Sequence, residues 1–433
     1  MIKYFTLSFL ISILFFPLLQ AQECSDRYRA KVFSKIDVDA NIVFGQTEIS
    51  GASAPLRYDV YMPHDDTVAL RPLVILWHGG GFLDMFKKTS PDIVALAKDL
   101  AKAGYVVISP DYRGIRDFSD LLNKKELIKE VVKAAIDGNK AICHILDQIE
   151  NQGNPYRINQ NEIFAGGVSG GAVLGLHLIL MNSVSDLPAE FVAWAREVDG
   201  GVIDQLFDTK YCNHPNIIKG FFSISGGIVD TAFIKPTPTD FIFYHGTADP
   251  LIPYDKGKPM GGLYDAPDLY GSKPIHEKME EIGMHSILYS YPGVGHVPFL
   301  NLDLVSFFKQ WNLVNKDIYI ETLETMTDYM FSKIECVPLS TDTTVATSIR
   351  NTHTQALRLY PNPTNSTFEM DLPESGKWQL SVFNLSGKLI EQSSFQGVHF
   401  QQSIEQYGKG IYFIQVKNLG GKDLTFYGKV IHP

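Results

Sequence analysis

The sequence of 433 residues has few cysteines and no excess of positive charge. Its four cysteines are widely spaced and form no CxxC pair, so the sequence does not indicate a zinc site. The formal net charge is −10 at pH 7, which argues against a nucleic-acid partner because phosphates require a basic protein face. Hydrophobic residues make up 45% of the chain, an ordinary share for a globular protein with a sizeable core.

Long hydrophobic runs are also lacking, except at the beginning of the chain. Lys3 supplies a positive charge, Phe5–Leu19 is almost entirely apolar, and Ala21 is a small residue at a suitable cleavage position. This order predicts a secretory signal peptide over residues 1–21. The run is too short to span a membrane comfortably, and no later stretch reaches the required length. We therefore expect an exported chain with no stable membrane span.

Strand-like and helix-like segments alternate between residues 22 and 336. Short apolar runs predict buried strands at 73–77, 105–109, 162–168, 220–225, 241–245 and 286–291. Helical spacing of apolar residues predicts helices at 125–149, 170–181 and between Ser90, which we expect as its cap, and Gly104. This alternation predicts an α/β fold with a doubly wound, mostly parallel sheet.

Two segments depart from this rhythm. Residues 183–216 are polar and aromatic, and their place after a predicted helix favours a small cap over a pocket. Residues 337–356 are rich in Ser and Thr and indicate a linker. From 357 to 433 short alternating strands and turns predict a second domain, a small β-sandwich.

Export would permit disulfide bonds. Four cysteines allow three pairings, and the sequence does not choose between them. Cys24 and Cys336 flank the first domain, and domain termini often lie close together. We therefore expect a disulfide between Cys24 and Cys336.

The pentapeptide Gly167-Val168-Ser169-Gly170-Gly171 has the pattern G-x-S-x-G. It follows a predicted strand and opens a predicted helix, which is the context of a nucleophile elbow. The glycines are needed because the turn is sharp and a β-carbon beside the serine would clash. The pattern therefore predicts that Ser169 is a nucleophile.

A second glycine motif, His78-Gly79-Gly80-Gly81-Phe82, follows an earlier predicted strand. Acyl transfer builds negative charge on a carbonyl oxygen, which backbone N–H groups stabilise. An HGGG element supplies one part of such an oxyanion hole, and the residue after the nucleophile supplies the other. We expect Gly80, Gly81 and Gly170 to be the donors, although the sequence does not decide among the three glycines of the motif.

A serine hydroxyl needs a base to take its proton. In folds with this elbow the chain order is serine, acid, histidine. Asp249 follows the predicted strand 241–245, and His296 follows the predicted strand 286–291. The pattern predicts a catalytic triad of Ser169, Asp249 and His296.

Other polar residues near the motifs have structural interpretations. His78 precedes the serine in the chain and is interpreted as an anchor of its loop. Asp111 and Arg113 follow an earlier strand and are interpreted as bracing the sheet. Ser225 lacks the first glycine of an elbow, and His245 is expected to hydrogen-bond the loop after its strand.

At this point the first domain resembles the HGGG-bearing esterases of the α/β-hydrolase superfamily, near the hormone-sensitive-lipase-like and feruloyl-esterase-like carboxylesterases. The matching stretches are 78–82, 109–113, 167–171, 245–250 and 293–296. The resemblance implies an α/β-hydrolase fold and a carboxylesterase or lipase-type activity through an acyl-enzyme, without a cofactor. Many relatives carry Ala or Met where this chain has Gly170, so substrate preference is not carried over.

Residues 357–433 resemble the C-terminal sorting domain of type IX secretion. The motifs are LYPNP at 359–363, VFNLSGK at 382–388, GIY at 410–412 and KVI at 429–431. The resemblance implies handling by the type IX secretion machinery and a secreted or cell-surface location. A carbohydrate-binding β-sandwich is the alternative interpretation of this domain.

The expected substrate is a small-molecule or polymer-borne ester with a short acyl group, acetyl and feruloyl groups included. Two alternatives remain at this stage. One is a serine peptidase of the prolyl-oligopeptidase type, which uses the same order of residues. The other is a non-catalytic binding module on a hydrolase scaffold.

Overall fold

The computed structural model describes residues 26–49, 52–208, 212–214, 216–263, 265–300, 315–334 and, with gaps, 354–432. The chain divides into two compact units, 1–339 and 340–433, and each is described by itself. The expected signal peptide lies outside the described residues, and so does the expected linker except for residues 354–356, which form a strand.

The first unit is built on an eight-stranded sheet in the order β1-β2-β4-β3-β5-β6-β8-β11. The first two strands are antiparallel to their neighbours, and the six from β4 to β11 are parallel. The bounds are β1 Ile36–Ile49, β2 Ala52–Pro63, β3 Arg71–Trp77, β4 Val106–Pro110, β5 Ile158–Val168, β6 Ile218–Ile224, β8 Asp240–Gly246 and β11 Ser286–Tyr291. The predicted mostly parallel sheet is confirmed.

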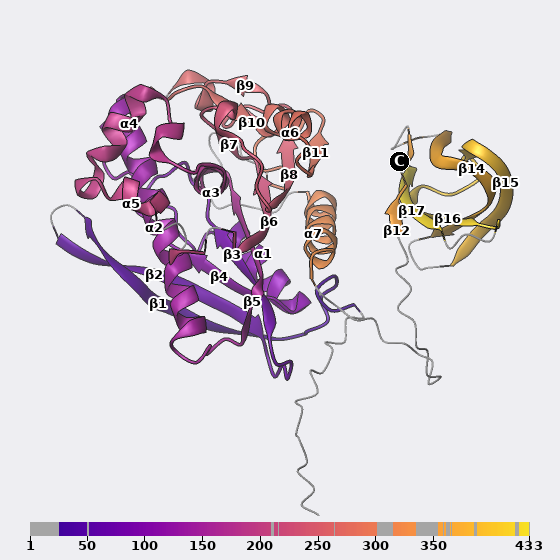
Figure 1. The fold of residues 1–433 in the computed structure, drawn as a ribbon, viewed down its shortest axis with the longest axis horizontal. Helices are drawn as coiled ribbons and strands as arrows, with labels where there is room; N and C mark the ends of the chain where they lie inside the picture. Colours follow the sequence, from indigo (N-terminus) through magenta and orange to yellow (C-terminus); the bar gives the residue numbers. More distant parts are fainter. Residues whose placement is uncertain are drawn as a thin grey trace, which may run out of the picture. The chain divides into compact units, whose positions relative to one another are not determined.

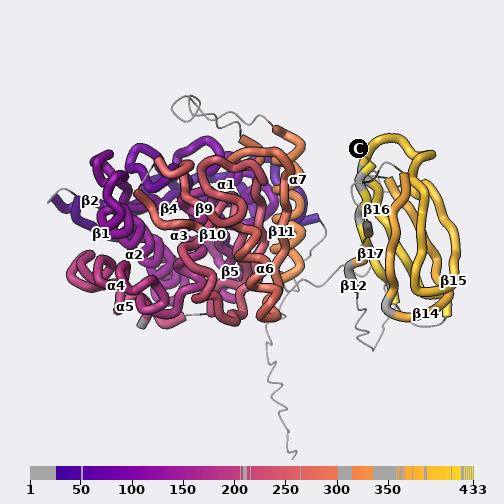
Figure 2. Tube along the Cα trace, turned by 90° about the horizontal axis from the view of Figure 1, so that it is seen from above, coloured from indigo at the N-terminus to yellow at the C-terminus, as the bar shows by residue number. Residues whose placement is uncertain are grey.

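Helices cover both sides of this sheet (Figures 1 and 2). The larger ones are α1 (Pro91–Ala103), α2 (Lys124–Glu150), α3 (Gly170–Leu180), α6 (Ser272–Glu281) and α7 (Lys316–Phe331). Strand β3 shows why two layers form. Its side chains alternate, so that Leu73 and Ile75 join the core under α2 and α3 while Val74 and Leu76 join the core under α1 and α7. No helix among the described residues is long and apolar enough to cross a membrane.

The ends of α1 show how local sequence sets helix bounds. Pro91 occupies the start of the helix, and Gly104 ends it in a left-handed conformation with φ 117°. Ser90 occupies the N-cap position as expected, but its side chain makes no capping hydrogen bond, and its hydroxyl donates to the Lys87 carbonyl at 2.8 Å.

A second, small sheet has the strand order β7 (Gly227–Ile228), β10 (Leu269–Gly271) and β9 (Lys256–Gly257). The segment 183–216 contains two short helices, α4 (Ala189–Arg196) and α5 (Val202–Asp208). Its apolar side chains pack into the core that α2 and α3 share, among them Phe191, Ala195, Ile203 and Leu206. The segment is therefore part of the first unit's packing, and its role as a cap stays a prediction.

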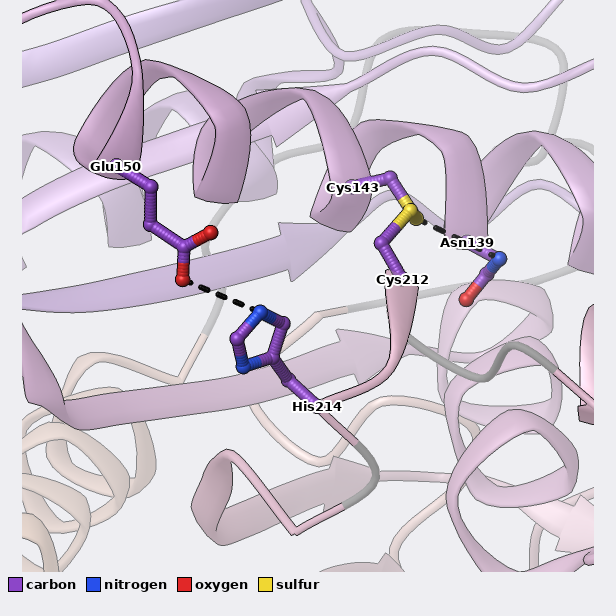
Figure 3. The surroundings of a disulfide bond; sticks show 5 residues. All are labelled: Asn139, Cys143, Glu150, Cys212 and His214. Atoms are coloured by element: carbon purple, nitrogen blue, oxygen red, sulfur yellow. Dashed lines mark hydrogen bonds and ion pairs between the residues drawn. A yellow bond between two sulfur atoms is a disulfide. The ribbon is translucent and has the colours of Figure 1, made fainter.

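An ion-pair bridge and a disulfide bond connect this segment to α2. The Arg113 guanidinium binds Asp137 of α2 at 2.8 Å and Asp199 of the segment at 2.8 Å. Arg113 thus joins a helix to the segment rather than bracing the sheet, because its fork reaches two carboxylates at once. The second connection is a disulfide between Cys143 of α2 and Cys212, beside the ion pair of His214 with Glu150 at 3.1 Å (Figure 3).

The Cys143–Cys212 bond decides between the three pairings that the sequence left open. Two of the pairings are excluded, and the remaining one joins Cys24 to Cys336. Both of those residues lie outside the described part of the chain, so that disulfide stays a prediction.

The second unit is a β domain with the strand order β12-β17-β16-β14-β13, and β15 pairs with β14. All pairs except β12–β17 are antiparallel. Trp378, Leu380 and Val382 alternate along β14 and are fully buried, as the alternating pattern predicts. The long strands β14 and β15 curve around this core (Figure 1). The bounds are β12 Thr354–Ala356, β13 Leu359–Tyr360, β14 Thr367–Asn384, β15 Leu389–Ser403, β16 Gly410–Asn418 and β17 Thr425–His432.

The Cys143–Cys212 bond should stabilise the first unit substantially, because it closes a loop across a sequence separation of 69 residues. Loop-closure entropy predicts that replacing both cysteines by serine lowers the free energy of unfolding by about 4 kcal/mol. Urea unfolding of the non-reduced wild type and of the double variant measures the difference. Equal midpoints and slopes would contradict the prediction.

Candidate active site

The turn after β5 is sharp. Ser169 stands between β5 and α3 with φ 51°, in the left-handed region. A β-carbon at position 167 would lie 2.4 Å from the carbonyl carbon of Gly171, and one at position 171 would lie 2.3 Å from the Trp77 carbonyl oxygen. Both positions therefore require glycine, and the turn presents the Ser169 side chain beyond the end of the strand.

The structure brings the three predicted triad residues together. Ser169 Oγ lies 2.7 Å from His296 Nε2, and His296 Nδ1 lies 2.7 Å from Asp249 Oδ2. The three residues follow the carboxyl ends of β5, β8 and β11, which meet at one edge of a parallel sheet. With Asp249 accepting at Nδ1–H, Nε2 is free to accept the serine proton.

Asp249 is held in its ionised form although its side chain is fully buried. Burial acts to raise the pKa of this carboxyl, but the interaction with His296 and the hydrogen bonds from His245 and His296 outweigh it. The net result is a pKa well below the ordinary value. Its other oxygen, Oδ1, accepts from the N–H groups of Leu251 at 2.8 Å and Ile252 at 3.0 Å. The site therefore keeps a full negative charge next to the imidazole.

Backbone N–H groups of two segments meet beside Ser169. The nitrogens of Gly81 and Phe82 lie 3.3 and 3.4 Å from the position a β-carbon would occupy at Gly170. Within the described residues, no hydrogen bond from the N–H groups of Gly81, Phe82 or Gly170 is present. Gly81, Phe82 and Gly170 also line one pocket with Ser169, so their N–H groups are candidates for binding a developing oxyanion.

The predicted oxyanion residues thus divide. Gly81 and Gly170 line the pocket with Ser169. Gly80 packs against Phe86, since a β-carbon there would lie 2.3 Å from the Phe86 Cβ, and it does not line the pocket. Phe82, which the sequence did not propose as a donor, also lines the pocket, and its φ of 62° lies in the left-handed region.

His78 has the geometry of a loop anchor. Its ring stacks on Tyr112 with centroids 4.1 Å apart, and the Tyr112 hydroxyl donates to the His78 carbonyl at 2.7 Å. Burial lowers the pKa of His78 to about 3, so the ring stays neutral. Asp111 accepts from the N–H of Lys88 at 2.9 Å and likewise holds the same loop.

The pocket beside Ser169 is almost entirely apolar. Its wall comes from the loop after β3, α2, α3, the 183–216 segment and the loops after β7, β8 and β9, with Leu127, Val131, Val173, Leu187, Leu251 and Met260 among its residues. Apart from Ser169, His177 is the one polar side chain among the described lining residues. Its Nδ1 donates to the Val173 carbonyl at 2.7 Å, and its Nε2 accepts from the Val229 N–H at 3.2 Å. His177 therefore offers no free polar group to a ligand.

Ser225 was interpreted from the sequence only as an incomplete elbow, but the structure shows a further contact. Ser225 follows β6 with φ 52°, and its hydroxyl accepts from the N–H of Val297 at 3.0 Å. Val297 is itself in the left-handed region with φ 52°, which is costly for a β-branched residue. Ser225 thus holds the turn that carries His296. The signal in the sequence was its SISGG motif, which resembles an elbow and so predicts a strained turn at Ser225.

Two family models match the chain, one in each unit. Residues 358–429 match the model described as secretion system C-terminal sorting domain, and residues 58–200 match the BD-FAE model. No curated protein matches the chain.

Solved structures that resemble the chain include esterase 2 of the Planctomycetes species Thermogutta terrifontis. Its propionate-bound form is 17% identical, with 69% of this chain and 96% of that chain covered and a TM-score of 0.44. Its apo form is 18% identical, with 69% and 96% covered and a TM-score of 0.43.

The family matches establish the coarse identity of the two units. The first unit contains an esterase-like α/β-hydrolase domain. The second is a sorting domain, which indicates export through type IX secretion to the cell surface or the outside. Both resemblances noted in the sequence are confirmed.

His177 should make the protein less stable in acid. Burial lowers the pKa of His177 to about 4, whereas an unfolded histidine titrates near pH 6.5. Between these values the unfolded chain binds a proton that the folded chain does not, so the free energy of unfolding falls as the pH falls, by about 3 kcal/mol at pH 4 from this group. Unfolding of wild type and His177→Leu between pH 7 and 4 should show a shallower pH dependence for the variant.

The exposed His285 provides the matched control. His285→Gln removes an exposed imidazole instead of a buried one, and should leave the pH dependence of wild type in place. Parallel curves for wild type and His177→Leu would contradict the assignment of this acid sensitivity to His177.

Proposed function

We propose that this chain is a secreted serine carboxylic-ester hydrolase that works through an acyl-enzyme intermediate. The observation that carries the proposal is the continuous hydrogen-bonded chain from Asp249 through His296 to Ser169, with both contacts at 2.7 Å. The unpaired N–H groups of Gly81, Phe82 and Gly170 beside the serine support it. Together they supply a nucleophile, a base, an orienting acid and donors for an oxyanion.

In the proposed reaction Ser169 Oγ attacks the ester carbonyl while His296 Nε2 takes its proton. The tetrahedral oxyanion is stabilised by the backbone N–H groups of Gly81, Phe82 and Gly170. The imidazolium, stabilised by Asp249, then gives its proton to the leaving alcohol, and the Ser169 acyl-enzyme remains. Water attacks the acyl-enzyme with His296 again as the base, which releases the acid and restores the serine.

The pocket favours an acyl group without polar substituents. Its described wall offers apolar side chains, and the one imidazole there already makes two hydrogen bonds. A feruloyl phenol placed in this pocket would lose water without gaining a partner, which costs free energy. We therefore propose short unsubstituted acyl groups, acetyl included, on a small or polymer-borne alcohol. Export by the sorting domain is consistent with a substrate too large to import.

Ser169→Ala should abolish ester turnover and leave the fold intact. Because members of a triad act as a unit, the loss in kcat should be on the order of 10⁴-fold or more. Hydrolysis of p-nitrophenyl acetate by the purified variant measures it, with circular dichroism as the fold control. Turnover within tenfold of wild type would contradict the proposed nucleophile.

Asp249→Asn should also be severe, with a loss of about 10⁴-fold in kcat, because an amide favours the wrong imidazole tautomer and does not stabilise the imidazolium. Asp111→Asn is the matched control, since Asp111 is a partly buried carboxylate that binds the Lys88 N–H instead of a histidine of the site. A silent Asp249→Asn beside a crippled Asp111→Asn would mean that the acid is wrongly assigned.

The acyl preference is tested with p-nitrophenyl esters from acetate to palmitate, run beside methyl ferulate, acetylated xylan and an aminoacyl amide. Each methylene that enters an apolar pocket adds about 1 kcal/mol, and the gain stops when the pocket is full. We therefore expect kcat/KM to reach its maximum among the shorter acyl chains. Efficiency that rises beyond about eight acyl carbons would make the enzyme a lipase. Preference for the amide would make it a peptidase.

A further inference from the structure

His245 is a second histidine on the catalytic carboxylate. It is the last residue but one of β8 and lies four positions before Asp249, and both side chains are fully buried. Its Nε2 lies 3.1 Å from Asp249 Oδ2, the same oxygen that His296 contacts at 2.7 Å. The proposed acid therefore joins two imidazoles, of which only one reaches the serine.

The surroundings of His245 select one tautomer. Its Nε2 faces two acceptors, Asp249 Oδ2 at 3.1 Å and the Ile252 carbonyl at 3.1 Å, so Nε2 carries the hydrogen. Its Nδ1 lies 2.7 Å from Ser272 Oγ at the beginning of α6. In this tautomer the Ser272 hydroxyl donates to Nδ1, and each ring nitrogen has a hydrogen-bond partner.

The donors on Asp249 show what His245 adds. Two backbone N–H groups, those of Leu251 and Ile252, hold Oδ1. A carboxylate held at one oxygen still turns about that contact, and Oδ2 is the oxygen that must face His296. Among the described residues Oδ2 has two donors, His296 and His245. His245 thereby fixes the plane of the carboxylate.

We infer that His245 is a positioning residue of the catalytic site, and that Ser272 sets its tautomer; the inference rests on the proposed function. His245 does not line the pocket, so it has no means of acting on substrate binding directly. It acts through Asp249, which orients His296 at the moment of proton transfer. Its removal should therefore change kcat and leave KM nearly unchanged.

The test compares four variants with wild type on p-nitrophenyl acetate. His245→Leu removes the donor to Oδ2, and misplacement of the carboxylate should lower kcat by about 10- to 100-fold with KM within about twofold. His245→Gln places an amide N–H near the position of Nε2 and should keep kcat within about threefold of wild type. Ser272→Ala should lower kcat several-fold, because it leaves Nδ1 without its donor.

The fourth variant, His276→Gln, is the matched control. His276 also pairs with a serine, its Nδ1 lying 2.7 Å from Ser286 Oγ, and it lies on the same helix as Ser272 but makes no contact with Asp249 among the described residues. Its kcat should equal that of wild type. A loss equal to that of His245→Leu would mean that disturbance of this region, and not the donor to Asp249, sets the rate.

The outcomes separate this inference from the proposed function. Wild-type kcat in His245→Leu, or equal losses in the Leu and Gln variants, would overturn the positioning role even while Ser169→Ala is inactive. An active Ser169→Ala would overturn the proposed function instead. If His245→Leu does not fold, as judged by circular dichroism, full kcat in Ser272→Ala overturns the inference and a several-fold loss at unchanged KM supports it.

Discussion

The close approach of the turn after β5 to the end of β3 constrains the rest of the first unit. A β-carbon at Gly171 would lie 2.3 Å from the Trp77 carbonyl oxygen, so the two strands run side by side only with glycine in the turn. This contact places the HGGG loop, which leaves β3, against the beginning of α3. The Gly81 and Phe82 nitrogens therefore lie beside Gly170, and Ser169 stands between them and His296.

A buried carboxylate is the second constraint. Because the Asp249 side chain is fully buried, its ionised form needs donors on both oxygens. Four hydrogen bonds provide them, from two backbone N–H groups and two histidines. Ser225 holds the strained turn at Val297 in a similar way. The groups around the proposed triad thus stabilise geometry that the backbone alone would not keep.

Much of this was predictable from the sequence because the signals are local. The runs of apolar residues mark β3, β4, β5, β6, β8 and β11, since buried strands need apolar side chains on both faces. The G-x-S-x-G pentapeptide and the acid-before-histidine order identified Ser169, Asp249 and His296 as candidates, and the structure brings them together. The composition change after Cys336 located the sorting domain, which the family match confirms.

By itself the sequence determined the order of the elements, the glycines of the elbow and the residue types of the site, because each depends on neighbours along the chain. Tertiary structure alone decided that the Gly81 and Phe82 nitrogens lie close to Gly170, that Arg113 bridges α2 to the 183–216 segment and that Cys143 pairs with Cys212. It also decided that His245 shares the carboxylate with His296. The physical reason is that these contacts depend on distances between loops far apart in sequence, which the packing of helices on the sheet sets.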